Sequence, residues 1–266
     1  MAQEKWLVDG EKVIDVETVR KLKIGLIAGQ VNVIGHDEPG ARIEVHSVTG
    51  KELRVVLDGD TLEINYAQFR WDNFMEVLKS FRGRARVDVS VRVPRDVALE
   101  FGVVSANALI TGLRSDATIS TVSGDLVIDS HTGALGLNAV SGEISVRDHS
   151  GSIVAHTVSG DVTATGKITS FAADSVSGDV FLDLAGIPDQ VKVNSVSGSV
   201  AARLESGVPA QYSINTVSGR IQLDESEIRG VRGSYSGSVG VLDKLWLAFS
   251  ANTVSGSISV VHAVSV

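Results

Sequence analysis

The sequence reads VSGDLVIDS at residues 122–130, VSGEISVRD at residues 140–148 and VSGDVTATG at residues 158–166. The tripeptide Val-Ser-Gly occurs seven times, starting at Val122, Val140, Val158, Val176, Val196, Val217 and Val254. Counted in positions, the steps between copies are 18, 18, 18, 20, 21 and 37. A short and nearly constant period indicates that one coil of chain stacks on another, as in a solenoid.

Two further corners fit the same series. Val104-Ser105-Ala106 precedes Val122 by the same step that separates Val122 from Val140. Tyr235-Ser236-Gly237 lies close to midway between Val217 and Val254, so it divides the longest step into two ordinary ones. We therefore expect about nine repeats between residues 104 and 266.

Each 18-residue repeat divides into two units of nine residues. Glycine recurs at the third place, where a turn needs a positive φ or a close backbone approach. The fifth and seventh places alternate with polar ones, as in a strand with one buried face. These apolar or small places are Leu126 and Ile128, Leu135 and Leu137, Ile144 and Val146, Ile153 and Ala155, Val162 and Ala164, Phe171 and Ala173, and Val180 and Leu182. The pattern predicts an all-β fold, a parallel β-solenoid of about 18 residues per coil whose two sheets face each other.

The residue before each Val-Ser-Gly is small or polar. The series is Thr121, Ala139, Thr157, Ser175, Ser195, Thr216 and Thr253. Stacked coils would place these residues in one column, beside a column of valines and a column of serines. Such ladders hold the register, because a slip would break every column at once.

Residues 1–103 lack the repeat, and we expect them to form an irregular β region that caps the solenoid of residues 104–266. Strand-like stretches occur at 12–19, 21–27, 30–35, 41–48, 52–58, 61–66 and 84–93. Turn residues such as Pro39-Gly40 and Asp58-Gly59-Asp60 separate them. We interpret these stretches as irregular or wider coils that begin the same sheets.

One short helical insertion is predicted over residues 68–82, where aromatic and apolar residues fall at helical spacing. The segment from 66 to 86 is also basic, in a chain of net charge -8. The insertion either caps the end of the solenoid or binds a protein partner or a membrane surface. The candidate interface residues are Phe69, Arg70, Trp71, Phe74, Met75, Leu78, Phe81 and Arg82.

The composition excludes several classes of function. The net charge of -8 disfavours nucleic-acid binding. The chain has no cysteine, so disulfides, thiolate metal sites and cysteine nucleophiles are excluded. The start, Met1 to Trp6, is not a secretory signal, and no run of 18 apolar residues could span a membrane. We expect a cytoplasmic location.

Acidic residues occupy the fourth place of four successive corners, Asp125, Glu143, Asp161 and Asp179. Stacking would set these carboxylates about 4.8 Å apart. The column is either a solvated acidic edge that limits aggregation or a binding site for calcium or magnesium. His131 and His149 open successive second half-turns, with Lys167 next in the series. We expect them in a solvated column of turns.

The (Ser/Thr)-Val-Ser-Gly-(Asp/Glu/Ser) corners resemble the bacterial putative adhesin family, a β-strand-repeat domain of unknown function. The stretches Gly29-Gln30-Val31-Asn32-Val33-Ile34-Gly35 and Val91-Arg92-Val93-Pro94-Arg95-Asp96 are similar to that family's entry into its repeats. The resemblance covers roughly residues 20–262. It implies the repeat fold and a surface location, and it carries no catalytic residues to this chain.

We expect a non-enzymatic structural or interaction module, either self-associating or protein-binding, without catalytic residues or cofactors. Gly-x-Ser-x-Gly is absent, and no serine stands apart from its repeats. The last coil, Ser257 to Val266, shows no charged or proline-bearing cap and should pair with another surface. The alternatives are an adhesin-like surface or carbohydrate binder, and a polysaccharide-acting β-helix enzyme using an acid pair such as Asp174 and Asp183.

Overall fold

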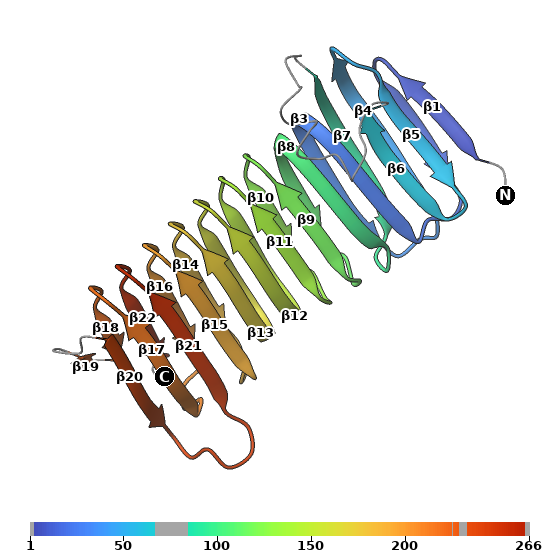
Figure 1. The fold of residues 1–266 in the computed structure, drawn as a ribbon. Helices are drawn as coiled ribbons and strands as arrows, with labels where there is room; N and C mark the ends of the chain where they lie inside the picture. The colour runs from blue at the N-terminus through green and yellow to red at the C-terminus, as the bar shows by residue number, and fades with distance from the viewer. Residues whose placement is uncertain (1–2, 67–84, 225, 229–232, 264–266) are drawn as a thin grey trace. The chain divides into compact units, whose positions relative to one another are not determined.

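A computed structural model describes residues 3–66, 85–224, 226–228 and 233–263 of the chain. Within these residues the protein is all-β, with 22 strands and no helix (Figure 1). Contacts divide the chain into two compact units, residues 1–133 and 134–266. The helical insertion predicted over residues 68–82 lies outside the described residues.

The first unit contains ten strands. They are β1 (Glu4–Val8), β2 (Lys12–Val16), β3 (Lys21–His36), β4 (Ala41–Thr49), β5 (Leu53–Asp58), β6 (Thr61–Tyr66), β7 (Arg86–Pro94), β8 (Ala98–Thr111), β9 (Ala117–Thr121) and β10 (Leu126–Asp129). The predicted stretch 61–66 coincides with β6, and the stretches 21–27 and 30–35 form the single strand β3. The pattern missed β1.

The long strands β3 and β8 organise this unit, because they run in parallel along each other. The first part of β3 also pairs with β6 and its second part with β7, both in parallel. On its other side β8 pairs in parallel with β9 and then with β10. Leu99 lies opposite Ala117 and Ala108 opposite Leu126, so the offset between neighbouring strands equals one predicted repeat.

The outer strands of the first unit are antiparallel, which corrects the expectation of wider coils. β5 pairs antiparallel with β1 and β6, and β4 pairs antiparallel with β2 and β7. Between β5 and β6 only Gly59 and Asp60 remain, with Gly59 at φ 63°. A two-residue loop can join only antiparallel strands. The local turn chemistry therefore overrides the parallel order of the repeats.

The second unit contains twelve strands. They are β11 (Leu135–Ala139), β12 (Ile144–Thr157), β13 (Val162–Ser175), β14 (Val180–Leu184), β15 (Gln190–Ser195), β16 (Val200–Leu204), β17 (Ala210–Thr216), β18 (Ile221–Leu223), β19 (Ser226–Ile228), β20 (Gly233–Val239), β21 (Leu247–Thr253) and β22 (Ile258–His262).

Parallel pairing builds most of the second unit, and its first strands pair at the repeat offset. Ile144 lies opposite Val162, and Val162 lies opposite Val180. Ile153 lies opposite Phe171 in the second half of the same coils. The predicted alternation is confirmed in both units, because every apolar residue assigned to the fifth and seventh places is buried. Hydrophobic burial of one side of each strand thus follows directly from the sequence pattern.

The coils of the second unit are not stacked in chain order. The last coil, β21 and β22, lies between earlier ones: β21 pairs with β15 and β17, and β22 pairs with β16 and β18. The expectation of an open final coil at residues 257–266 is therefore wrong for β22, which has a parallel neighbour on both sides.

The corner at Tyr235 is also not an ordinary repeat. It lies in β20, which pairs antiparallel with β17 from Ala210 opposite Val239 to Thr216 opposite Gly233. β19 pairs antiparallel with β18 in the same way. β20 carries no buried residue among those described, so it lacks the apolar face that would let it form a coil.

Candidate interaction surfaces

Five of the six Val-Ser-Gly corners of the second unit are closed by the hydroxyl that precedes them, and the sixth, at Val140, follows Ala139. The backbone N–H of Gly160 donates to Thr157 Oγ1 at 2.9 Å. The same bond joins Gly178 to Ser175 at 2.9 Å, Gly198 to Ser195 at 2.8 Å, Gly219 to Thr216 at 2.9 Å and Gly256 to Thr253 at 3.0 Å. Because these hydroxyls are buried, each one satisfies a backbone donor that water could not reach.

The serine of each corner holds the neighbouring coil. Ser177 donates its backbone N–H to the Val158 carbonyl at 2.9 Å, and its Oγ lies 3.3 Å from the same oxygen. Ser159 and Ser197 repeat this arrangement on Val140 and Val176. These serines are thus engaged in stacking, and none of them faces a histidine in a described hydrogen bond.

Glycine ends each corner because the backbones of adjacent coils touch there. A Cβ on Gly178 would lie 2.0 Å from the carbonyl oxygen of Gly160, and one on Gly198 would lie 2.0 Å from that of Gly178. Real Cβ atoms do not approach an oxygen so closely, so only glycine permits this stacking distance. The Ser or Thr before the valine, the serine and the glycine of the motif therefore serve to hold the coils together.

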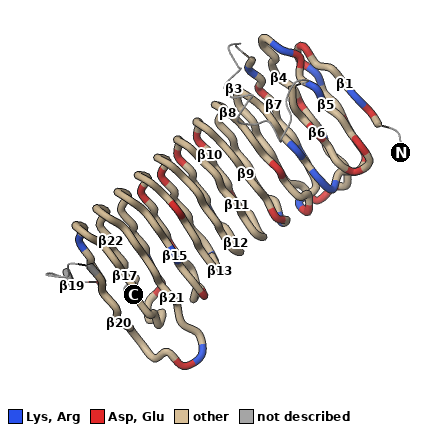
Figure 2. The backbone as a smooth tube through the Cα atoms, viewed as in Figure 1, with Lys and Arg blue, Asp and Glu red and all other residues tan. Residues whose placement is uncertain are grey.

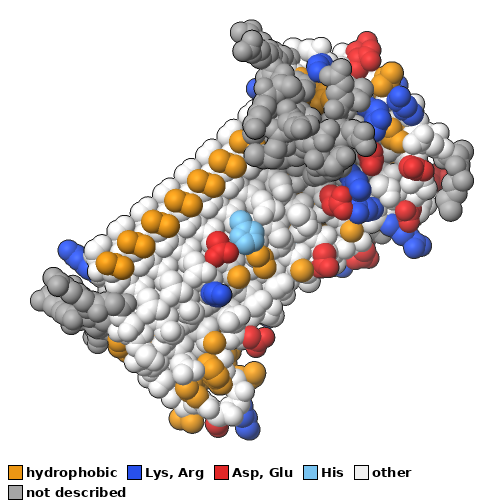
Figure 3. Space-filling model, viewed as in Figure 1, with side chains coloured by type: hydrophobic (Ala, Val, Ile, Leu, Met, Phe, Trp, Pro, Cys, Tyr) orange, Lys and Arg blue, Asp and Glu red, His pale blue; other side chains and the backbone are white. Residues whose placement is uncertain are grey.

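The valine of each corner points outward and forms a row that we call the valine ridge. Its members in stacking order are Val140, Val158, Val176, Val196, Val254 and Val217. The first five are 46–50% exposed, and Val217, at the end of the row, is 69% exposed. Figure 3 shows hydrophobic side chains in a row along these corners. A contiguous apolar surface of this kind marks an interaction site more often than scattered residues do.

Two of the acidic residues at the fourth place, Asp161 and Asp179, accept hydrogen bonds from backbone N–H groups. The N–H of Asp179 donates to Asp161 Oδ1 at 2.8 Å, and the N–H of Ser199 donates to Asp179 Oδ1 at 2.7 Å. In the first unit the N–H of Asp125 donates to the side chain of Asn107 at 3.0 Å. Across the described residues, no group of three or more His, Asp and Glu side chains is arranged to hold a metal ion. The geometry assigns the carboxylates of Asp161 and Asp179 a part in holding one coil on the next.

The two predicted turn histidines are buried, not solvated. His131 and His149 are each 1% exposed. His131 Nε2 lies 3.0 Å from the carbonyl oxygen of Ser115. Burial lowers the pKa of the His131 imidazole, against the opposing effects of this carbonyl and of Asp116. An imidazole is large enough to fill the corner, and its neutral form tolerates the apolar surroundings.

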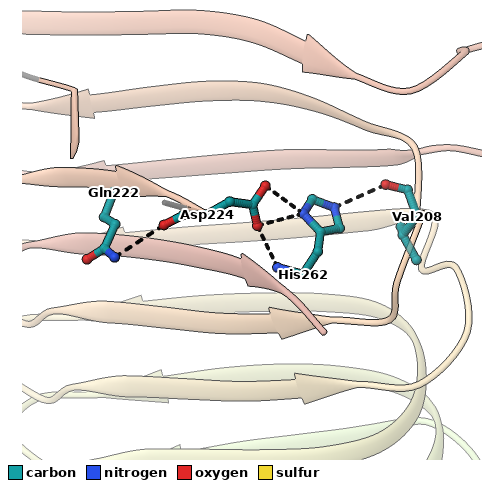
Figure 4. Close-up of polar contacts among 4 residues, drawn as sticks. All are labelled: Val208, Gln222, Asp224 and His262. Atoms are coloured by element: carbon teal, nitrogen blue, oxygen red, sulfur yellow. Dashed lines mark hydrogen bonds and ion pairs between the residues drawn. The ribbon is translucent and has the colours of Figure 1, made fainter. Parts of the chain in front are cut away.

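A clasp of polar contacts fastens the end of β22 (Figure 4). His262 Nδ1 lies 3.0 and 3.1 Å from the two carboxylate oxygens of Asp224, and His262 Nε2 lies 3.2 Å from the carbonyl oxygen of Val208. The backbone N–H of His262 also donates to Asp224 Oδ1 at 2.7 Å. Both ring nitrogens face acceptor oxygens, so the contacts tie the His262 ring to Asp224 and to the loop before β17. Sequence spacing gave no sign of this pair, because 38 residues separate the partners.

Shallow hollows flank the exposed side chain of Phe181 on β14. Phe181 is 45% exposed, and its register neighbours are the smaller Thr163 and Ala201. The hollows on the two sides have volumes of about 270 and 300 Å³. Asp183 and Arg203 form an ion pair beside it.

The acid pair of the alternative enzyme hypothesis is not assembled. Asp174 lies in β13 where that strand pairs with β15, whereas Asp183 lies in β14, which pairs with β16. Asp174 accepts a hydrogen bond from Asn194 at 2.8 Å, and Asp183 is engaged by Arg203. The structure thus does not bring these two acids together as a catalytic pair.

The first unit holds more of the charged residues than the second (Figure 2). Residues 1–133 contain 36 of the charged side chains and residues 134–266 contain 20. A depression of about 620 Å³ is lined by Asp15, His36, Asp37, Glu38, Arg42 and Arg92, among others. Arg42 pairs with Asp15 and Glu44, and Arg95 pairs with Asp37, so opposite charges largely satisfy one another here.

The candidate interface residues from Phe69 to Arg82 lie outside the described residues. The strands on either side of them are described. β6 pairs with β3 up to Gly25, and β7 pairs with β3 from Ala28 onward.

The fold and its corners define a class: an all-β protein of repeated strands whose corners are closed by a hydroxyl, a serine and a glycine. The chain belongs to the Toastrack DUF4097 family, whose model matches residues 19–261. The resemblance to the putative adhesin family of unknown function is thereby confirmed.

Solved structures similar to this chain include three of related description. One is a putative adhesin from Bacteroides fragilis, with 11% identity, 98% of this chain and 97% of that chain covered, and a TM-score of 0.48. A putative adhesin from Parabacteroides distasonis has 12% identity, coverages of 98% and 97%, and a TM-score of 0.43. A putative cell adhesion protein from Clostridium sporogenes has 12% identity, coverages of 95% and 99%, and a TM-score of 0.29.

No curated protein matches this chain significantly. The part of the chain that the structure describes holds no helix with the length and apolar character needed to cross a bilayer.

Proposed function

We propose that the chain is a non-enzymatic interaction module, a β-solenoid of short, nearly constant coils that binds a protein partner along the valine ridge. The ridge is the observation that carries this proposal. Its six valines leave about half or more of each side chain exposed, in one continuous row.

The fold itself does not require valine at this place. The preceding hydroxyl, the serine and the glycine make the hydrogen bonds and close contacts that stack the coils. The valine side chain makes none of these hydrogen bonds, and about half or more of it is exposed. A row of apolar side chains with polar serines beside it matches the composition of protein interfaces, which have an apolar centre and a polar rim.

The experiment compares partner capture by the wild-type chain with that by a triple variant, Val158→Ser, Val176→Ser and Val196→Ser. We expect specific partners from the native cell to be retained by the wild type and lost from the variant, at an unchanged circular dichroism spectrum. Val154→Ser is the matched control, because Val154 is 45% exposed on a strand away from the corners. Equal capture by the triple variant and the wild type would refute the ridge as the binding surface.

An adhesin-like carbohydrate binder is the second candidate, and Phe181 favours it. Aromatic rings stack on the apolar faces of sugars, and Asp183 and Arg203 would supply hydrogen-bonding groups beside the ring. This function requires export to the cell surface, whereas the first is compatible with the cytoplasmic location that we expect. Cell fractionation separates the two. The division into a capping region, 1–103, and a repeat region, 104–266, stays a prediction.

A further inference from the structure

The second unit ends in a strand whose outer backbone is open. β20 pairs with β17 along its whole length, and it has no other strand partner among the described residues. In an antiparallel pair the backbone N–H and C=O groups of alternate residues point away from the partner strand. Half of the backbone of β20 therefore faces outward and can accept another strand.

The sequence of β20 does nothing to prevent such pairing. It reads Gly-Ser-Tyr-Ser-Gly-Ser-Val, without a charged residue or proline. The outer strands of the first unit differ, because β1 carries Glu4 and Lys5, and β2 carries Lys12 and Asp15. Charged side chains are the usual protection of an edge strand. The outer strands of the first unit are thus protected, and β20 is not.

An apolar loop continues directly from this edge. Val239 is 42% exposed, Val241 73%, Leu242 36% and Leu245 62%. Figure 3 shows hydrophobic side chains gathered at the loop between β20 and β21. Several exposed aliphatic side chains beside an unpaired strand edge indicate a surface that another protein surface buries.

We propose that β20 pairs antiparallel with β20 of a second copy of this chain, around a two-fold axis at Ser236. The proposal rests on the proposed function as an interaction scaffold and names one of its partners. Residues 233–239 are centred on Ser236, so this register uses the whole strand. Ser234 then lies opposite Ser238, and Tyr235 lies opposite Gly237.

The sequence is self-complementary in this register. Serine hydroxyls face each other and no like charges are opposed, while each Tyr235 ring lies over Gly237 of its own strand. An isologous two-fold contact of this kind closes as a dimer and does not propagate. Seven paired residues and the apolar loop bury roughly 800 Å² per partner or less, so we expect a dimer with Kd in the micromolar range.

The decisive experiment is disulfide crosslinking, which the absence of native cysteines makes unambiguous. Directly opposite residues in an antiparallel pair have Cβ atoms about 4.5–5.5 Å apart, close to the distance of a disulfide. Ser236→Cys should therefore form a covalent dimer on mild oxidation. Ser238→Cys would place its two sulfurs roughly 13 Å apart along the strand and should crosslink at least tenfold more slowly. Thr169→Cys, at an exposed site in a strand paired on both sides, is the background control.

A second measurement follows the equilibrium without a covalent bond. Sedimentation of the wild-type chain between about 1 and 200 µM should show a monomer–dimer equilibrium in the range expected for a small interface. Ser236→Lys sets two positive charges on the axis and should weaken the dimer at least tenfold, with Thr169→Lys as its control.

Three results would overturn the proposal. They are a monomer at all concentrations, equal crosslinking of Ser238→Cys and Ser236→Cys, and a Ser236→Lys variant that dimerises like the wild type. Partner capture by the monomeric Ser236→Lys variant keeps this result separate from the test of the valine ridge.

Discussion

At the residue scale, each position of the corner motif has a separate physical task. The hydroxyl of Ser175 accepts the Gly178 N–H, the serine bonds to the coil before it, and glycine lets two backbones touch. Valine is the position that stacking leaves half exposed. This division explains why threonine and serine interchange before the valine, since either hydroxyl can accept the glycine N–H, although Ala139 stands at this place in one copy.

Gly178→Ala tests the close approach. Its Cβ would lie 2.0 Å from the Gly160 oxygen and 2.7 Å from that carbonyl carbon, so the coils would have to separate locally. We expect a loss of about 3 kcal/mol in the free energy of unfolding, measured by urea denaturation. Gly10→Ala is the control, because nothing lies within 4 Å of its Cβ, and it should change stability by less than about 0.5 kcal/mol. Equal stability of the two variants would contradict the steric explanation.

At this scale the sequence alone predicted most of the local features. It predicted the alternating apolar places, the column of small or polar residues before the valines, and the glycine turns. Turn chemistry and burial act between neighbouring residues, so a local pattern reveals them. The expectation that the two turn histidines are solvated was wrong. His131 and His149 stand at turn positions, and nothing local reveals that packing encloses their rings.

At the element scale, strands differ in what holds their ends. β22 stops at the clasp, where Asp224 at φ 50° turns its carboxylate onto both the ring and the N–H of His262. Aspartate and asparagine are among the residues that adopt such a positive φ most readily. The clasp joins the ends of β22 and β18 to the loop before β17, so it limits fraying of the last strand.

Asp224→Ala should release this end. We expect a loss of about 1 kcal/mol, since the carboxylate is partly exposed, and at least tenfold faster hydrogen exchange of the His262 amide. Asp224→Asn retains a side-chain oxygen and the tolerance of positive φ, so its effect on exchange should be clearly smaller. Unchanged exchange at His262 in Asp224→Ala would show that β22 is held by its ladder bonds alone.

The sequence predicted less reliably whether neighbouring strands run parallel or antiparallel. The turn at Asp58-Gly59-Asp60 predicted where β5 and β6 are joined, but its two-residue loop also dictates an antiparallel pair, and we expected a coil. Similarly, Tyr235-Ser236-Gly237 matches the spacing of the repeats without the apolar alternation of a coil strand. Spacing alone does not make a coil strand, because only the alternation provides a face to bury.

At the scale of the whole molecule, the last coil of the second unit is inserted between two earlier coils. β21 and β22 carry the buried side chains Leu247, Phe249, Ala251, Ile258 and Val260. They bridge the coil of β15 and β16 to the coil of β17 and β18. β17 and β18 precede in the chain the coil on which they stack. This end of the unit can therefore assemble only after β21 and β22 have taken their place.

A chain that ends at residue 246 should lose this end entirely. Burial of five apolar side chains contributes on the order of 10 kcal/mol, comparable with the whole stability of a domain. We expect loss of cooperative unfolding by circular dichroism and rapid proteolysis between residues 205 and 246, whereas a chain ending at residue 263 should behave as the full chain does. If the coils were stacked in chain order, the shorter chain would instead remain folded, only with one coil fewer.

The sequence by itself determined most of the strands, the direction of their side chains, the offset of one repeat between the first coils of the second unit and the family, because these depend on local turn chemistry and on period-two burial. Only the tertiary structure decided the order of the coils, the antiparallel strands β19 and β20, and the open edge at Ser236. The reason is that repeats present nearly identical surfaces to one another. The local pattern fixes how any coil sits on a neighbour, and long-range packing selects which neighbour it is.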